Sequence, residues 1–220
     1  MSMPEVDPKD FIITRKRKLY KFALFNNSSL CYELDEWKQK SADVIELGAG
    51  TGLFSVELAK RYPDKQFVAI DVKADRLQTG ARLATELGLQ NISFVRARVE
   101  DQLSSMFVPH SLQSIWVTFP DPFPKKRAAT RRMTHPQFLE IYANLLNSDG
   151  ALYLKHDSPA FFNWSLEQLV TEKWRFDELS FDLHDSELSN DYKIQTTYEK
   201  RWLGEGATTN FVKAFPKSAN

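Results

Sequence analysis

The sequence predicts an α/β fold, with a doubly wound and mostly parallel sheet that ends in an antiparallel strand. Short apolar runs alternate with amphipathic stretches about every 20 to 25 residues, as in successive βαβ units. These runs are almost continuously apolar, which indicates strands buried on both faces of the sheet. The 220 residues suffice for one domain with a full hydrophobic core and are too few for two ordinary domains.

The predicted strands follow one another along the chain with helices between them. The strand ranges are 43–47, 67–70, 92–95, 115–119 and 152–154. Helices are predicted at 53–59, 77–88, 138–146 and 159–170, and turns at 62–64, 89–91 and 147–150. Because a strand, a crossover and a parallel strand form a right-handed unit, we expect helices on both faces of one sheet.

The two ends of the chain depart from this pattern. Residues 174–183 alternate between apolar and polar, and 209–215 form an apolar run after a turn at 204–206. These two segments predict an antiparallel hairpin that closes the edge of the sheet. Residues 1–40 are predicted to be an irregular lead-in with a basic arm at 15–18, which leaves a single domain over 41–220.

The composition excludes several classes of protein. The chain is 42% hydrophobic and 26% charged, as in soluble globular proteins, and no apolar run approaches the roughly 18 residues of a membrane span. Its first ten residues lack the pattern of a signal peptide. The single cysteine, Cys31, excludes an internal disulfide, and the four histidines have no metal-ligand spacing. We expect a cytoplasmic protein without a metal.

The formal net charge is zero, but the charges are distributed unevenly. Nine cations lie within two short segments, 15–18 and 125–132. Binding to phosphate depends on the local field and not on the total charge, so these segments are candidate contacts for a nucleic acid. The alternative interpretation is an ordinary solvated surface.

A glycine-rich loop follows the first predicted strand. It reads Glu-Leu-Gly-Ala-Gly-Thr-Gly at 46–52, and Asp71 ends the second strand. Glycines there allow a tight turn and close approach of a ligand, and an acid at the second strand accepts hydrogen bonds from ribose hydroxyls. Leu53 stands where a dinucleotide fingerprint has its third glycine, so S-adenosylmethionine is favoured over NAD. The predicted cofactor-binding residues are Glu46, Gly48, Gly50 and Asp71; a glycine turn with a capping acid is the alternative.

A proline-rich loop follows the fourth predicted strand, at the same edge of the sheet. It reads Phe-Pro-Asp-Pro-Phe-Pro-Lys-Lys-Arg at 119–127. Its three alternating prolines predict an extended, rigid segment that holds Asp121 while its cations reach outward. A rigid acid beside a basic run suits a charged substrate, and a plain connector with a basic tail is the alternative.

Four motifs together resemble the bacterial tRNA (guanine-N7)-methyltransferase family. They are Ile-Glu-Leu-Gly-Ala-Gly-Thr-Gly at 45–52, the proline loop at 119–127 with Arg131-Arg132, Leu-Lys-His-Asp at 154–157 and Thr-Thr-Tyr-Glu at 196–199. The segment 181–185 also resembles a family segment. The proline motif is far more specific than the glycine loop, and the resemblance runs in order from about residue 42 to the C-terminus. It implies a Rossmann-like, class I S-adenosylmethionine (AdoMet)-dependent methyltransferase domain that acts on a guanosine in the variable loop of tRNA.

The resemblance also implies roles for individual residues. Asp121 matches the proposed catalytic acid, which with Glu46 and Asp71 also contributes to AdoMet binding. The positions matching the family's substrate residues are Lys125, Asp157, Thr196, Thr197, Tyr198 and Glu199. The run at 15–18 matches the family's basic arm. Arg98 is a departure, since the family usually has an aspartate there, beside the adenine; we expect Arg98 to turn outward, and the alternative is that Glu100 or Asp101 supplies the missing acceptor.

The implied chemistry needs no base to deprotonate the nucleophile, because guanine N7 carries an exposed lone pair. Alignment and electrostatics then supply the rate, and the Asp121 carboxylate can accept hydrogen bonds from the guanine N1–H and N2–H edge. Asp157 and Glu199 could share this role. The five tryptophans are expected in the core, and Phe123 is the one aromatic residue expected to contact the base. The competing functions are a same-fold methyltransferase acting on a protein or a small acidic molecule, a non-catalytic RNA-binding module and an NAD-dependent oxidoreductase.

Overall fold

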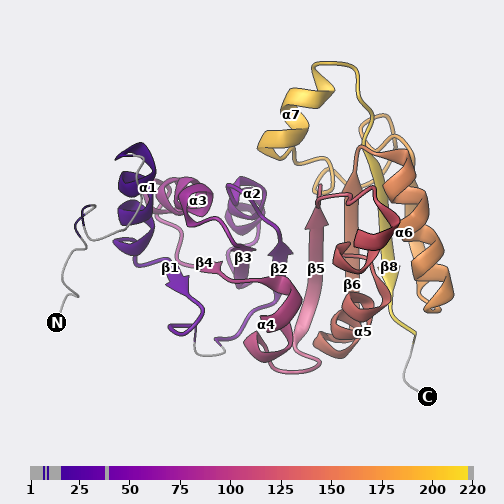
Figure 1. The fold of residues 1–220 in the computed structure, drawn as a ribbon, viewed down its shortest axis with the longest axis horizontal. Helices are drawn as coiled ribbons and strands as arrows, with labels where there is room; N and C mark the ends of the chain where they lie inside the picture. Colours follow the sequence, from indigo (N-terminus) through magenta and orange to yellow (C-terminus); the bar gives the residue numbers. More distant parts are fainter. Residues whose placement is uncertain (1–6, 8, 10–15, 38–39, 218–220) are drawn as a thin grey trace.

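The computed structural model describes residues 7, 9, 16–37 and 40–217, which form one eight-stranded sheet with helices on both faces (Figure 1). The strands are β1 (Cys31–Glu33), β2 (Val44–Leu47), β3 (Phe67–Asp71), β4 (Ile92–Arg96), β5 (Leu112–Thr118), β6 (Leu146–His156), β7 (Arg175–Ser180) and β8 (Asn210–Phe215). The helices are α1 (Lys16–Asn26), α2 (Leu53–Arg61), α3 (Ala74–Glu86), α4 (Val99–Met106), α5 (Pro136–Leu145), α6 (Pro159–Thr171) and α7 (Thr197–Leu203), with a short 3-10 helix, η2 (Lys126–Arg131). The predicted α/β class is confirmed.

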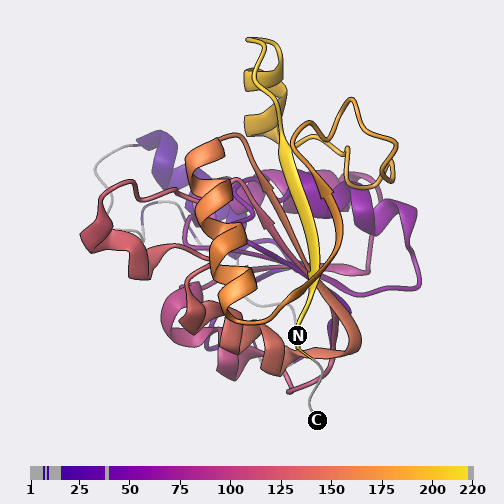
Figure 2. The ribbon, with the colours of Figure 1, turned by 90° about the vertical axis from the view of Figure 1, so that its right-hand side faces the viewer.

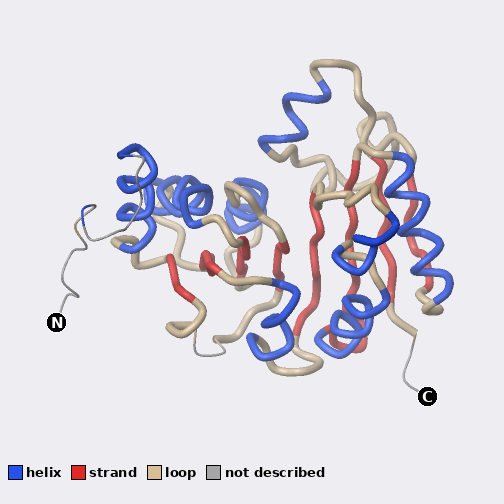
Figure 3. Tube along the Cα trace, viewed as in Figure 1, coloured by secondary structure: helices blue, strands red, loops and turns tan. Residues whose placement is uncertain are grey.

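The strand order is β1-β4-β3-β2-β5-β6-β8-β7, and β1 to β6 are parallel (Figure 3). The chain builds outward from β2 through β3 to β4 and then returns to place β5 on the other side of β2. Strand β8 is antiparallel to both β6 and β7, which confirms the predicted antiparallel ending. The order reverses between β2 and β5, so a ligand site is expected at their carboxyl ends.

Two hydrophobic clusters cover the two faces of the sheet. One cluster joins the sheet to α4, α5 and α6, with Phe138 and Phe162 buried in it. The other joins it to α1, α2, α3 and the segment after β7, with Phe54 and Phe94 buried. Figure 2 shows the sheet twisted between these layers. Among the described residues, no helix is both long and apolar enough to cross a membrane.

The expectation of an irregular lead-in is wrong for the part that the structure describes. Helix α1 packs on α3, and its Ala23 and Phe25 are buried. Strand β1 pairs with β4 and extends the sheet by one strand. Of the predicted basic arm, Arg15 and the side chains of Lys16 and Arg17 lie outside the described residues, and Lys18 is exposed. The division at residue 40 stays a prediction.

The predicted turn at 147–150 is also wrong, because these residues lie within β6. The pairing of β5 with β6 shifts there, from Leu112 opposite Leu146 to Ser114 opposite Ala151. The four residues between bulge out of the ladder, and the Asn147 side chain accepts a hydrogen bond from the Asp149 amide. Turn-forming residues therefore mark a β-bulge and not the end of a helix–strand loop.

Candidate functional site

A cavity of about 380 Å³ lies at the carboxyl ends of β2, β3 and β5, where the strand order reverses. Three of the predicted site residues line it: Gly48, Asp71 and Asp121. The other residues that line it include Arg98, Glu100, Phe119, Phe123, Arg131 and Met133. The structure therefore brings the glycine loop, the acid of the second predicted strand and the proline loop to one place.

The glycine loop needs a backbone that other residues rarely adopt. Gly48, Gly50 and Gly52 have φ angles of 68°, 57° and 69°. At Gly52, the N-cap residue of α2, a Cβ atom would lie 2.6 Å from Cε1 of Phe94. The loop is thus fixed both by its left-handed turns and by close packing on β4.

Asp71 is held by the glycine loop itself. Its Oδ2 accepts a hydrogen bond from the Gly50 amide at 2.9 Å, and its Oδ1 accepts one from the Lys73 amide at 2.8 Å. Burial raises the pKa of Asp71 above its ordinary value, and these two amides oppose that shift. Each carboxylate oxygen keeps a lone pair, so the side chain is oriented and can still accept from a ligand hydroxyl.

Glu46 lies beneath the loop and does not line the cavity. It is 1% exposed, and its carboxylate accepts hydrogen bonds from Ser55 Oγ at 2.6 Å and Thr118 Oγ1 at 2.8 Å. Burial raises the pKa of Glu46 to about 7, against the effect of the two hydroxyls. Glu46 therefore ties β2 to α2 and β5 from within.

The Asp121 carboxylate is exposed at the mouth of the cavity. Its loop is not uniformly extended as expected, because Phe119 and Phe123 have φ angles of 50° and 40°. Both precede prolines, which ordinarily favour extended backbone in the residue before them. Such conformations cost on the order of 1–3 kcal/mol each and persist only where the surroundings impose them.

Two side chains hold these strained positions. His156, which is buried, lies with Nε2 3.0 Å from the Pro120 carbonyl oxygen, and its Nδ1 accepts from the Ser158 amide at 2.8 Å. Because a carbonyl oxygen can only accept, the Nε2 N–H donates to it, and Nδ1 also lies 3.1 Å from Asp157 Oδ1. Arg132 donates to the Phe123 carbonyl at 3.0 Å and stacks on Trp164 at 4.3 Å.

The basic run after the loop forms η2, and most of it faces solvent. Lys125, Lys126, Arg127 and Arg131 are exposed, and Arg131 lies over the Phe123 ring at 4.3 Å. Arg132 differs, because its guanidinium is hydrogen-bonded to the Phe123 carbonyl of the loop. The predicted cationic surface therefore consists of Lys125, Lys126, Arg127 and Arg131.

The remaining predicted substrate residues meet at α7, a helix that sequence reasoning missed. It stands at the carboxyl edge of the sheet (Figure 1). Thr196 caps it and forms a capping box with Glu199. Thr197 Oγ1 lies 3.1 Å from Thr51 Oγ1 in the glycine loop, and the Tyr198 hydroxyl donates to Asp157 Oδ2 at 2.9 Å.

Glu199 points inward, into a polar cluster buried under α7. Its Oε2 accepts from Lys155 Nζ at 2.7 Å, and its Oε1 contacts His184 Nε2 at 2.8 Å and Thr209 Oγ1 at 3.1 Å. Lys155 and Glu199 side chains are 0% and 1% exposed. Burial lowers the pKa of Lys155, and the Glu199 carboxylate opposes that change. A lysine directly after the apolar run predicted at 152–154 was the one sequence signal for this cluster.

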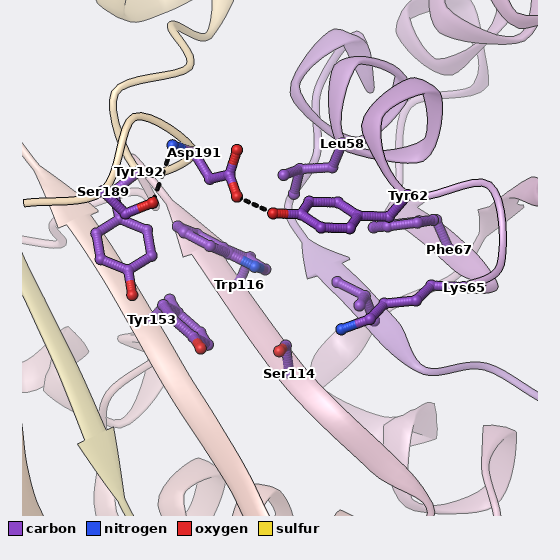
Figure 4. Close-up of a pocket in the computed structure, with 11 residues that line it drawn as sticks. Leu58, Tyr62, Lys65, Phe67, Ser114, Trp116, Tyr153, Ser189, Asp191 and Tyr192 are labelled. Atoms are coloured by element: carbon purple, nitrogen blue, oxygen red, sulfur yellow. Dashed lines mark hydrogen bonds between the residues drawn. The ribbon is translucent and has the colours of Figure 1, made fainter.

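A second cavity, of about 230 Å³, opens on the face of the sheet between α2 and the segment after β7 (Figure 4). Trp116, Tyr153 and Tyr192 line it, and Asp191 at its rim accepts from the Tyr62 hydroxyl. It lies toward the amino ends of the strands, and no predicted site residue lines it. The described residues also hold no group of His, Cys, Asp or Glu side chains placed to bind a metal ion.

Comparison with known proteins gives consistent results. Residues 40–211 match the family model described as "Putative methyltransferase". The chain is 34% identical over 180 residues to a tRNA (guanine-N(7)-)-methyltransferase of Cytophaga hutchinsonii, covering 80% of this chain and 81% of that protein. It is 32% identical over 200 residues to the protein of the same name in Brevibacillus brevis, covering 89% and 92%. Among solved structures, an antibiotic-related methyltransferase aligns with a TM-score of 0.60 at 18% identity, over 86% of this chain and 96% of that one, which supports the fold alone.

Proposed function

Because the chain belongs to the tRNA (guanine-N7)-methyltransferase family, we propose that it transfers a methyl group from S-adenosylmethionine to N7 of a guanosine in tRNA. The observation that supports this proposal most directly is the cavity lined by Gly48, Asp71 and Asp121. We further propose that the target guanosine lies in the variable loop and that the reaction occurs in the cytoplasm.

The residues of the cavity fit a nucleoside cofactor. The glycine loop presents bare backbone, and the Asp71 carboxylate is already oriented by two amides with acceptor capacity left for ribose hydroxyls. When bound, AdoMet supplies an electrophilic methyl group on a sulfonium. In this proposal Glu46 acts indirectly, by fixing the base of the loop through Ser55 and Thr118.

The protein's contribution to the reaction is alignment and charge. Guanine N7 needs no deprotonation, so no residue has to act as a base toward it. The Asp121 carboxylate accepts hydrogen bonds from the Watson–Crick edge of the guanine and stabilises the positive charge that the purine gains. Phe119 and Phe123, which line the same cavity, exclude water from the reacting atoms and bound the position of the base.

The substrate positions carried over from the family divide into two groups in this proposal. Lys125, with Lys126, Arg127 and Arg131, neutralises tRNA phosphates. Thr197 and Tyr198 of α7 lie at the ligand edge with Asp157, which follows β6 and accepts from the Tyr198 hydroxyl, while Thr196 and Glu199 form the capping box of α7.

The test is incubation of the purified protein with AdoMet and unmodified tRNA, followed by mass spectrometry of the nucleosides. We expect 7-methylguanosine from the parent protein. Asp121→Asn should lose most single-turnover activity without unfolding, whereas the matched change Asp64→Asn, in the exposed turn after α2, should not. Methyl transfer to a protein fraction and not to tRNA would overturn the proposal, and a normal rate for Asp121→Asn would overturn the role of that residue.

A further inference from the structure

Helix α7 carries an aromatic surface that continues outward from the proline loop. The Tyr198 ring lies 5.3 Å from that of Phe119 and 5.8 Å from that of Trp202. Tyr198 is 45% exposed and Trp202 is half-buried. Contrary to expectation, Trp202 therefore lies outside the core, one helical turn from Tyr198 on the same face.

Cations accompany these rings. The Arg201 guanidinium lies 5.3 Å from the Trp202 ring, and Lys200 beside it is exposed. Glu205 is 3.8 Å from Arg201, but both side chains are largely exposed, so this pair is weak and a phosphate can replace it. Aromatic faces interleaved with cations are the pattern of unpaired nucleotide recognition, in which bases stack and phosphates pair.

The position of α7 determines which nucleotides it can meet. Thr197 contacts Thr51 of the glycine loop, and Tyr198 contacts Phe119 of the proline loop, so the helix spans the edge where Asp121 opens to solvent. A nucleotide that leaves the cavity past Phe119 therefore meets Tyr198 and then Trp202. We propose that Tyr198, Trp202 and Arg201 form a stacking surface for the tRNA nucleotides adjacent to the target guanosine; this rests on the proposed function.

The test compares tRNA affinity and its salt dependence among variants. Trp202→Ala should weaken tRNA binding roughly 5- to 150-fold, the range measured for loss of one stacked base, with an unchanged slope against salt. Trp202→Phe should recover most of the affinity. Arg201→Gln should instead lower the salt slope by about one unit. Val170→Ala, an exposed apolar change near the end of α6, is the matched control and should have no effect.

The outcomes separate the two proposals. If the parent protein forms no 7-methylguanosine in tRNA, the proposed function fails. If it does, and Trp202→Ala binds tRNA within about twofold of the parent, only the stacking surface is refuted. An equal loss of tRNA affinity in Trp202→Ala and Trp202→Phe would also refute the stacking surface, because a phenylalanine ring can stack on a base as a tryptophan ring does.

A separate observation, the strained backbone of the proline loop, carries a second inference. Phe119 is left-handed next to Pro120, whose carbonyl oxygen accepts from buried His156. The Phe119 amide also donates to the Lys155 carbonyl at 2.9 Å. The start of the loop is therefore hydrogen-bonded to the end of β6 twice, through the Phe119 amide and through the Pro120 carbonyl. We infer that His156 is a positioning residue that holds the Asp121 loop in its strained form.

The test measures kcat and AdoMet affinity separately in variants of His156. His156→Leu should lower kcat on the order of 10- to 100-fold, the scale of a misplaced catalytic group, with AdoMet affinity unchanged. His156→Gln keeps an N–H at similar reach and should restore much of the rate, which a purely structural role would not predict. An unchanged kcat in His156→Leu, or identical losses in both variants when both are folded, would overturn the inference.

Discussion

Replacing Glu199 with alanine should destabilise the protein far more than loss of a surface carboxylate. The side chain of Glu199 is 1% exposed, and its partner Lys155 is 0% exposed. Among the described residues, Glu199→Ala leaves the buried Lys155 ammonium with only the Ile194 carbonyl as a hydrogen-bond partner. Breaking a buried ion pair on one side costs about 3–5 kcal/mol, a large part of the 5–15 kcal/mol that stabilises a typical domain.

Urea unfolding followed by circular dichroism measures this effect. With a denaturant slope of about 2–3 kcal/mol/M, the loss corresponds to a midpoint lowered by roughly 1–2.5 M. Glu86→Ala, which removes an exposed pair with Arg82 on α3, is the control and should shift the midpoint little. The double variant Lys155→Met with Glu199→Gln removes both charges and should be more stable than Glu199→Ala.

The reasoning fails if the free energy of unfolding of Glu199→Ala lies within about 1 kcal/mol of that of the parent, since this would mean that the ion pair is not buried in solution. It also fails if the double variant is less stable than the single one. A stable Glu199→Ala that nonetheless failed to bind tRNA would instead make Glu199 a direct substrate ligand, as the family resemblance implies.

Four further predictions concern the cavity and its rim. Asp71→Ala should weaken AdoMet binding by about 1–3 kcal/mol in calorimetry, and unchanged affinity would remove Asp71 from the site. The pKa of Glu46 is raised from 4.5 to about 7, so its contribution to the free energy of unfolding, about 3 kcal/mol, is full below pH 4.5 and is lost as the pH rises through 7. Glu46→Gln should flatten the pH dependence of the urea midpoint. A variant whose midpoints change with pH in parallel with those of the parent would contradict this. Arg98→Ala should leave AdoMet affinity within about 1 kcal/mol, because Arg98 is exposed at the cavity and, as the N-cap residue of α4, makes no side-chain capping bond, while its backbone amide donates to Gln102 Oε1. A much larger loss would place its side chain on the cofactor. Neutralising the four exposed cations of the basic run should lower the salt slope of tRNA binding by roughly 0.9 for each phosphate that the variant no longer neutralises, and equal slopes would indicate a merely solvated surface. These cations are Lys125, Lys126, Arg127 and Arg131.

The sequence predicts well whatever depends on local pattern. The apolar runs locate the five central parallel strands, and the glycine and proline loops identify the edge where Asp71 and Asp121 meet. These predictions succeed because buried strands and glycine turns leave signals within a few residues. Helix α1 was missed because its apolar side is short and basic residues surround it.

Features that depend on tertiary contacts left weaker signals. His156 reads as one polar residue at the end of a strand, and its hydrogen bond is to a carbonyl 36 residues earlier. The left-handed Phe119 contradicts the local preference of a residue before proline. Such strain is imposed by the surroundings, so local sequence rules fail at this point of the site.

The segment Thr196 to Glu199 shows how far a motif can assign contacts. Successive residues of a helix point about 100° apart, so four consecutive side chains cannot all face one ligand. Tyr198 is 45% exposed at the ligand edge, whereas the next residue, Glu199, is 1% exposed and bonded to Lys155. The same geometry places Trp202, four residues after Tyr198, on the outward face. We therefore expect tRNA to meet Tyr198 and Trp202, and Glu199 to act by holding the helix that presents them.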